Sequence, residues 1–195
     1  MKKITIIIFC FFTAIMLHAQ VPGYQGKRAV LEVQASPSFV GLFQSEFGIP
    51  LTYKIHGEYA IKRKKSIGIE LRQMNISTNI NDIKSNYNNK MLMFLYTKYN
   101  RDWALAPYGH YFSYGLGYNI RSAKGLSSVD TTTVIKGNFL SFHLMWGQRY
   151  IIAKRLSLNY GFETGIPFNL GDGLTGAGDW ALMGFNLNLG LGFIF

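Results

Sequence analysis

Eight ionisable side chains recur on the polar side of segments in which apolar and polar residues alternate, and they are the groups best placed to do chemistry. Four are acids and four are bases: Glu32, Glu58, Glu70 and Glu163 against Lys54, Arg72, Lys98 and Arg149. If they are enclosed together they should pair, because an ion that leaves bulk water without a partner is costly. We therefore expect a salt-bridged interior and not an open pore. Charges that lie near a rim, in water, would contribute little.

Serine-based catalysis would need a nucleophile, a base and an orienting group in one place. His110 and Ser113 are close in sequence but have opposite parity, so a strand would point them to opposite faces. His56 and His143 share the polar face, and we identify no serine two residues from either with an evident partnering acid. We find no phosphate loop and no metal-ligand spacing. The prediction is a protein that is not an enzyme, with no catalytic residue, cofactor or metal.

The N-terminus has the layout of a secretory signal peptide. Lys2 and Lys3 precede an apolar run from Ile4 to Leu17, and Ala19 offers a small residue for cleavage. The run of about 14 residues is shorter than the roughly 20 that a membrane-spanning helix needs. We predict a signal peptide at 1–19 and a single barrel domain at 20–195. The only cysteine, Cys10, lies in the predicted signal, which would leave the mature chain without a thiol.

The elements that would position these charges are strands. The chain is 48% hydrophobic and 15% charged with 21 glycines, which excludes a charge-rich disordered chain and disfavours a helical bundle. Alternation of period two predicts eight strands. Their apolar rows begin with Leu31, Leu51, Ile67, Met91, Tyr108, Leu140, Leu156 and Ala181. In the fourth, Met91, Met93, Leu95 and Tyr99 share a parity opposed by Phe94, Tyr96 and Lys98, so both faces are apolar and we assign Lys98 to the polar one.

Connections of two lengths separate the predicted strands. Three are short, at 62–65, 102–106 and 153–155, and four are longer, at 37–49, 78–89, 122–136 and 169–178. Short and long connections alternate along the whole chain. This asymmetry is typical of an outer-membrane barrel with tight periplasmic turns and longer external loops, and it predicts that both termini lie in the periplasm.

Alternation alone does not say which face of the sheet points outward. A soluble eight-stranded barrel of the lipocalin kind has the same period with the apolar side chains inside. Glycine, serine and asparagine on the polar face suit a narrow lumen, and the bulky aromatic residues on the apolar face exceed what such an interior could hold. Aromatic residues also gather near the short turns, where they would form an interfacial ring: Tyr59, Tyr99, Tyr108, Tyr150 and Phe195. Tyr118 and Phe168 are candidates for the opposite ring. These features favour a barrel whose apolar face points outward, toward lipid.

Two further segments suggest contacts. The basic turn Lys62-Arg63-Lys64-Lys65 has no nucleic-acid motif beside it, so we predict that it meets phospholipid headgroups or water and that no nucleic acid binds. Phe39, Phe43 and Phe47 lie in the predicted loop from Ser38 to Ile49 and could contact a partner. The alternative is that this loop extends the first two strands above the membrane.

The signal ending in Ala19-Gln20, the lead-in from Val21 to Arg28, the eight strands and the alternating C-terminal row ending in Phe195 resemble small outer-membrane β-barrel proteins of Bacteroidota type, in the OmpX/OmpA-like group. This resemblance implies an eight-stranded up-and-down barrel in the Gram-negative outer membrane. It further implies that outer-membrane lipids surround the barrel and that the assembly machinery reads its C-terminal strand. The expected role is a surface or envelope protein, structural or adhesive, whose loops could meet an extracellular ligand. Alternatives are a small-solute, porin-like channel, a lipid-modifying enzyme or a soluble lipocalin-like binder.

Overall fold

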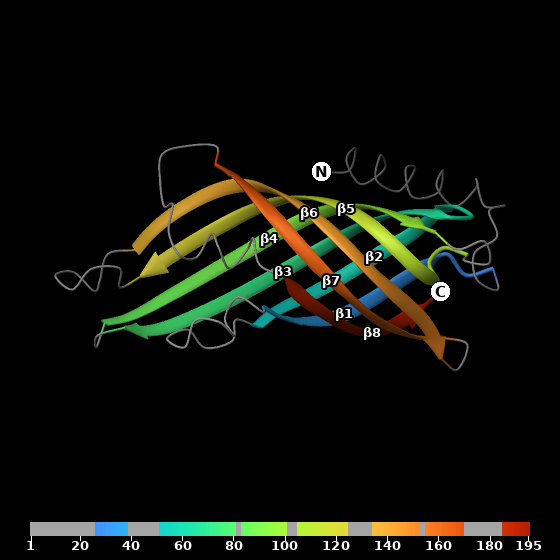
Figure 1. The fold of residues 1–195 in the computed structure, drawn as a ribbon, viewed down its shortest axis with the longest axis horizontal. Helices are drawn as coiled ribbons and strands as arrows, with labels where there is room; N and C mark the ends of the chain where they lie inside the picture. The colour runs from blue at the N-terminus through green and yellow to red at the C-terminus, as the bar shows by residue number, and fades with distance from the viewer. Residues whose placement is uncertain are drawn as a thin grey trace, which may run out of the picture.

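Eight antiparallel strands close into a barrel (Figure 1). The computed structural model describes residues 26–38, 51–80, 83–100, 105–124, 134–152, 155–169 and 185–195. The strands are β1 (Ala29–Pro37), β2 (Leu51–Lys62), β3 (Lys65–Ile80), β4 (Ile83–Tyr99), β5 (Gly109–Lys124), β6 (Val134–Ile152), β7 (Leu156–Asn169) and β8 (Asn186–Ile194). Each strand pairs with its neighbours in chain order, and β1 pairs with β8, which leaves no open edge around the body of the barrel. The predicted fold class is confirmed.

No helix in the described part of the chain is long and apolar enough to cross a membrane.

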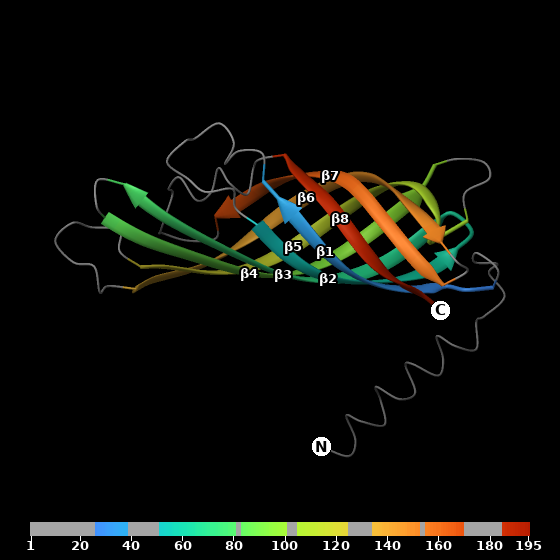
Figure 2. The same ribbon diagram turned by 90° about the horizontal axis from the view of Figure 1, so that it is seen from below.

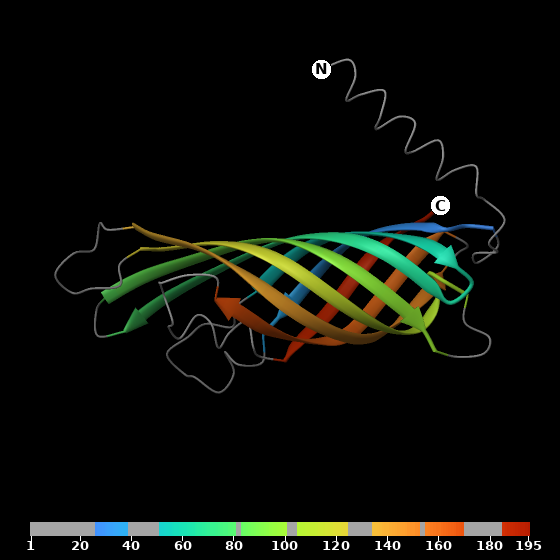
Figure 3. The same cartoon turned by 90° about the horizontal axis from the view of Figure 1, so that it is seen from above.

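Both ends of the described chain meet at one end of the barrel. The N–H groups of Arg28 and Ala29 donate to the carbonyl oxygen of Phe195 at 2.7 and 3.2 Å, and the N–H of Phe195 donates to Ala29 at 2.8 Å. Figures 2 and 3 show the C-terminus and the start of β1 at this end. The β2–β3 turn also lies here, so we call it the short-turn end and the other the long-loop end.

The burial pattern places the apolar face outward. In β8, Leu189 and Leu191 are 49% and 65% exposed, whereas Asn188 between them is 2% exposed. The same alternation holds in β1, where Leu31 and Val33 are exposed and Glu32 is fully buried. An apolar wall surrounds a polar interior, which is the inverse of a lipocalin-like barrel. The predicted orientation of the rows is therefore confirmed for seven strands.

The prediction for β4 is wrong, because its two faces are exchanged. Met93 and Tyr99 are 0% and 2% exposed and point into the lumen, whereas Phe94 is 58% exposed and Lys98 lies on the outer face. Tyr99 therefore belongs to the lumen and not to the aromatic ring predicted at the interface. The physical reason lies in other strands. The Tyr99 hydroxyl bonds to Glu58 of β2 and Arg149 of β6 across the lumen, and the methionine side chains fill space beside glycines of β5.

The predicted loop at 78–89 is also wrong, because β3 continues to Ile80 and β4 begins at Ile83. Short and long connections therefore do not alternate strictly. β5 and β6 likewise extend into the segment predicted as a loop at 122–136. The four strands β3 to β6 reach farther than their neighbours at the long-loop end, where Figure 1 shows them as a projecting sheet.

Several predictions fall outside the described residues. They concern the signal peptide at 1–19, the start of the lead-in, the phenylalanines Phe39, Phe43 and Phe47, and the first residues of the predicted last strand, including Ala181 and Met183.

Candidate functional site: the ion-paired lumen

Arg149 is the centre of an ion-pair cluster near the short-turn end. Its side chain is about 1% exposed, and its Nε and Nη2 atoms donate to the two carboxylate oxygens of Glu32 at 2.7 and 3.1 Å. The Nη1 atom donates to Glu58 at 2.9 Å, to the Tyr99 hydroxyl at 2.6 Å and to the carbonyl of Pro107 at 3.1 Å. A guanidinium suits this position because its planar set of five donors can serve several acceptors at once.

Neutral donors complete both carboxylates of this cluster. Glu32 also accepts hydrogen bonds at 2.9 to 3.0 Å from Gln34, Ser157 and Asn159. Glu58 accepts from Ser66 and, at 2.5 Å, from the hydroxyl of Tyr99. Each buried carboxylate thus has several donors, which offsets the cost of removing it from water.

Glu163 is the centre of a second cluster, deeper in the barrel. It binds Lys54 Nζ at 2.6 Å, pairs with Arg72, and contacts His143 Nδ1 at 2.7 Å. Lys54 also donates to Asn188 at 2.6 Å. Glu163 is on β7 and its partners come from β2, β3, β6 and β8, so this cluster connects the two sides of the barrel across its interior.

His56 joins the two clusters. Its Nδ1 lies 3.1 Å from Glu70, which also pairs with Arg72, and its Nε2 lies 3.0 Å from Glu58. Two ionised carboxylates can only accept, so both ring nitrogens must donate, as in the imidazolium form. The 3.4 Å approach of Arg149 to the same Nε2 is the longer contact.

The charges of these two clusters then balance. The four carboxylates of Glu32, Glu58, Glu70 and Glu163 face Lys54, Arg72, Arg149 and an imidazolium at His56. Seven of the eight predicted lumen ions are confirmed, and the eighth, Lys98, is replaced by His56. Toward the long-loop end lies a further buried cation, Arg121, which is 3% exposed, donates to the Tyr87 hydroxyl at 3.2 Å and lies over the Phe139 ring. Paired clusters of this kind are the arrangement that burial of ions requires.

Ser141, His143 and Glu163 form a chain of hydrogen bonds that the sequence analysis missed. His143 Nε2 is 2.8 Å from the Ser141 hydroxyl, and His143 Nδ1 is 2.7 Å from Glu163. The prediction that no serine two residues from His143 has a partnering acid is therefore wrong, because Glu163 comes from the neighbouring strand β7. All three side chains are at most 2% exposed, and Glu163 is already paired with Lys54 and Arg72. Serine, histidine and acid follow one another as in a catalytic triad, but these three side chains are enclosed in the lumen.

His110 and Ser113 lie on opposite faces of their strand, as their parity predicts. Ser113 points inward and its hydroxyl contacts Thr97 at 2.8 Å, whereas His110 has the outward parity of Phe112. Among the described residues, no group of three His, Cys, Asp or Glu side chains could hold a metal ion.

Side chains fill the lumen in the part of the barrel that the structure describes. Toward the long-loop end, Asn119 donates to Ser141 at 2.7 Å and Asn89 donates to Asn119 at 3.0 Å. A cavity of about 20 Å³, lined in part by Asn89, Met91 and His143, has room for about one water molecule. Eight strands enclose an interior that side chains can fill, and here they do.

Two glycines make room for an inward aromatic ring. A Cβ added to Gly147 would lie 2.6 Å from the Tyr111 hydroxyl, and one added to Gly161 would lie 3.2 Å from it. Without these Cβ atoms the Tyr111 hydroxyl has room to donate to Asn159 at 2.9 Å. The Tyr111 ring lies 5.6 Å from the Arg149 guanidinium carbon. Tyr111 was not predicted as a lumen residue, although its parity with Ser113 already indicated that it points inward.

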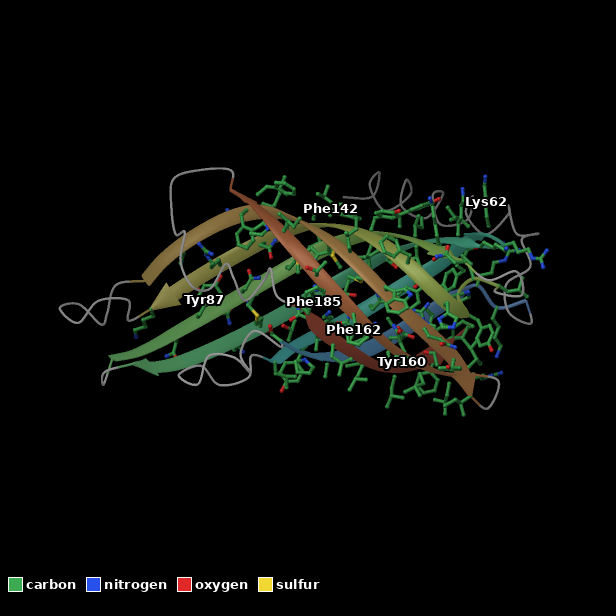
Figure 4. The ribbon with its side chains drawn as sticks, in the orientation of Figure 1. Lys62, Tyr87, Phe142, Tyr160, Phe162 and Phe185 are labelled. Carbon is green, nitrogen blue, oxygen red and sulfur yellow. The ribbon has the colours of Figure 1, made fainter. Side chains whose placement is uncertain are left out.

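Acidic and basic side chains are distributed differently between the lumen and the outer surface. Every acidic residue that the structure describes is in the lumen. Basic residues also occur outside, at both ends of the apolar wall: Lys62, Arg63, Lys65 and Lys98 at the short-turn end, and Lys90, Lys124 and Lys136 toward the long-loop end. Figure 4 shows Lys62 pointing away from the barrel, far from Tyr87 at the opposite end. The charged side chains on the described outer surface are therefore all cationic.

Comparison by sequence yields no match, either to a family model or to a curated protein. Comparison of structures does find similar barrels. Ail, the attachment invasion locus protein of Yersinia pestis, solved in complex with the heparin analogue sucrose octasulfate, has a TM-score of 0.56 and 11% identity over 87% of this chain and 99% of its own.

Two further solved structures have a TM-score of 0.53. Neisserial surface protein A is 9% identical over 85% of this chain and 95% of its own. The outer membrane protein OprG of Pseudomonas aeruginosa is 11% identical over 90% of this chain and 99% of its own. At these identities the likeness shows a shared fold, which is that of small outer-membrane barrels.

Proposed function

We propose that this chain is an integral outer-membrane protein of a Gram-negative envelope. The observation that carries this proposal is the inverted burial: large apolar side chains cover the outside, while the described acids and their partners are inside. Such a wall is stable in hydrocarbon, where a closed barrel also satisfies every backbone hydrogen bond between strands. The structural neighbours support the same location.

We further propose that the short-turn end faces the periplasm and the long-loop end faces the outside. At the short-turn end, β2–β3 and β6–β7 are joined by two and three residues, and the C-terminal Phe195 lies there too. At the other end, three of the four connections have nine or more residues, and the fourth, β3–β4, has two. Long external loops and short periplasmic turns are typical of bacterial barrels. The projecting sheet of β3 to β6 would then stand above the membrane surface.

The proposed role is that of a surface or envelope protein acting through its outer end. Lys90, Lys124 and Lys136 are exposed toward this end, and no described acid lies on the outer surface. Among the neighbours, Ail was solved with a sulfated sugar, which is a polyanion. These observations support an anionic surface ligand, bound through charge complementarity.

A channel is the alternative role, and the filled lumen counts against it. The ion-paired clusters cross the interior, and the cavity beside them has room for about one water molecule. Reconstitution into a planar bilayer tests this alternative, since a plugged barrel should give no large, stable conductance steps.

Cysteine labelling tests location and orientation together, because the only native cysteine, Cys10, lies in the predicted signal. In intact cells, a membrane-impermeant maleimide should label Lys136→Cys, and it should label Lys62→Cys only after the outer membrane is permeabilised. The reverse pattern would overturn the orientation. Recovery of the protein in the soluble fraction, with no mobility difference between unboiled and boiled samples, would overturn the membrane location.

Binding of sucrose octasulfate to cells tests the surface role. Cells that display the wild-type barrel should retain the sulfated sugar, and the variant Lys90→Gln/Lys124→Gln/Lys136→Gln should lose most of this binding. Equal binding by wild type and variant would overturn the anionic-ligand proposal.

A further inference from the structure

Three lysines form one row across the outer wall at the short-turn end. Lys62 and Lys65 are cross-strand partners in β2 and β3, and Lys65 and Lys98 are partners in β3 and β4. Lys62 and Lys98 are exposed, and Lys65 is half-buried with the outward parity of Ile67. Since neighbouring strands lie about 4.8 Å apart, the row spans about 10 Å along the membrane surface. We call it the lysine row.

Backbone hydrogen bonds hold the turn of this row in place. The carbonyl of Arg63 accepts from the N–H of Ala106 at 2.8 Å, and that of Lys64 accepts from the N–H of Tyr99 at 2.9 Å. Ala106 and Tyr99 are both buried. The turn is thus attached to β4 and to the segment before β5, so the backbone that carries Lys62 and Lys65 is in place before a ligand binds.

The surroundings of Lys98 are those of a membrane–water interface. Its Nζ lies 5.9 Å from the ring centre of Tyr96 and 5.8 Å from that of Tyr114. Farther into the wall follow exposed apolar side chains, among them Ile67 and Phe94. Lysine stems and tyrosine rings with their polar ends at one depth are typical of the headgroup region.

No Asp or Glu side chain of the described residues competes for these ammonium groups, because all four described acidic side chains are in the lumen. The acid closest along the chain on β2, Glu58, is already bound to Arg149, His56, Ser66 and Tyr99. The row therefore presents concentrated positive charge directly above an apolar wall, which is complementary to an anionic headgroup with its acyl chains below.

We propose that the lysine row binds the phosphate of an anionic phospholipid, such as phosphatidylglycerol, in the membrane leaflet at the short-turn end. This inference rests on the proposed membrane location. It adds a specific lipid class at a defined place on the wall. The Tyr96 and Tyr114 rings hold Lys98 at headgroup depth, and Lys62 and Lys65 supply the neighbouring charges.

Native mass spectrometry of the folded, detergent-solubilised barrel with equal amounts of phosphatidylglycerol and phosphatidylcholine tests the proposal. The wild type should retain phosphatidylglycerol preferentially. The variant Lys62→Gln/Lys65→Gln/Lys98→Gln should bind it roughly a hundredfold more weakly, on the scale of the attraction expected for three lysines. The matched control, Lys90→Gln/Lys124→Gln/Lys136→Gln, removes the same charge at the other end and should retain the preference.

Equal retention of the two lipids by the wild type would overturn the proposal, as would an equal loss in both triple variants, which would indicate a general surface potential. Heat-dependent gel mobility in vesicles separates this failure from that of the proposed function. A barrel that inserts but does not select phosphatidylglycerol refutes the lysine row alone, whereas a chain that does not insert refutes the membrane location as well.

Discussion

Replacing Arg149 with methionine would test the lumen network most directly. The change keeps an unbranched apolar stem, shortens the side chain and removes its donors to Glu32, Glu58, Tyr99 and the Pro107 carbonyl. Breaking a buried ion pair by removing one partner costs about 3–5 kcal/mol, because the other charge stays buried. In this variant Glu32 keeps three neutral donors, and Glu58 keeps two in addition to His56. We therefore expect the free energy of unfolding to fall by about 3 kcal/mol, near the lower end of that range.

Equilibrium unfolding in urea, in lipid vesicles, measures this loss as a lower midpoint at unchanged slope. Adding Glu32→Gln to Arg149→Met removes one of the unmatched carboxylates, so the double variant should be more stable than the two single effects predict by about 1–2 kcal/mol. The exposed control Lys136→Met should change the unfolding free energy by less than about 0.5 kcal/mol. If Arg149→Met stays within 1 kcal/mol of wild type, roughly the level of an exposed ion pair, the reasoning about a buried, paired lumen is refuted.

Three further predictions concern the same interior. His56→Leu should lower the unfolding free energy by about 1–3 kcal/mol, and Glu70→Gln added to it should recover part of that loss, since the imidazolium balances this carboxylate; additivity in the urea experiment would contradict the assigned charge. Gly147→Ala should destabilise the barrel, because its Cβ would lie 2.6 Å from the Tyr111 hydroxyl, whereas Gly137→Ala has open space and should be nearly neutral in the same assay; equal effects would argue against the close approach. A fluorophosphonate probe should not label Ser141 in the folded protein, because it is 1% exposed; labelling that disappears in Ser141→Ala would instead favour an enzyme.

Much of the barrel could be predicted from local pattern. In β1, β7 and β8 the two faces differ strongly in polarity, so period-two alternation indicated both the strand and its orientation. β4 has apolar side chains on both faces, and there the pattern could not decide between Phe94 and Met93 as the lipid-facing residue. The extended hairpin of β3 and β4 was missed because its polar residues around 78–89 lack an apolar row.

The sequence by itself determined the strand number, the polar interior and seven of the eight ions in the two clusters, because the choice of face in a strand follows from side-chain type and parity alone. The tertiary structure decided which ions pair, since closure of the barrel brings Lys54 to Glu163 and Glu32 to Arg149 across more than a hundred positions. It also decided that His56, and not Lys98, is the fourth cation of the two clusters, and that hydrogen bonds join Ser141, His143 and Glu163. These outcomes depend on register and on the space left by glycines of other strands, and a local pattern carries neither.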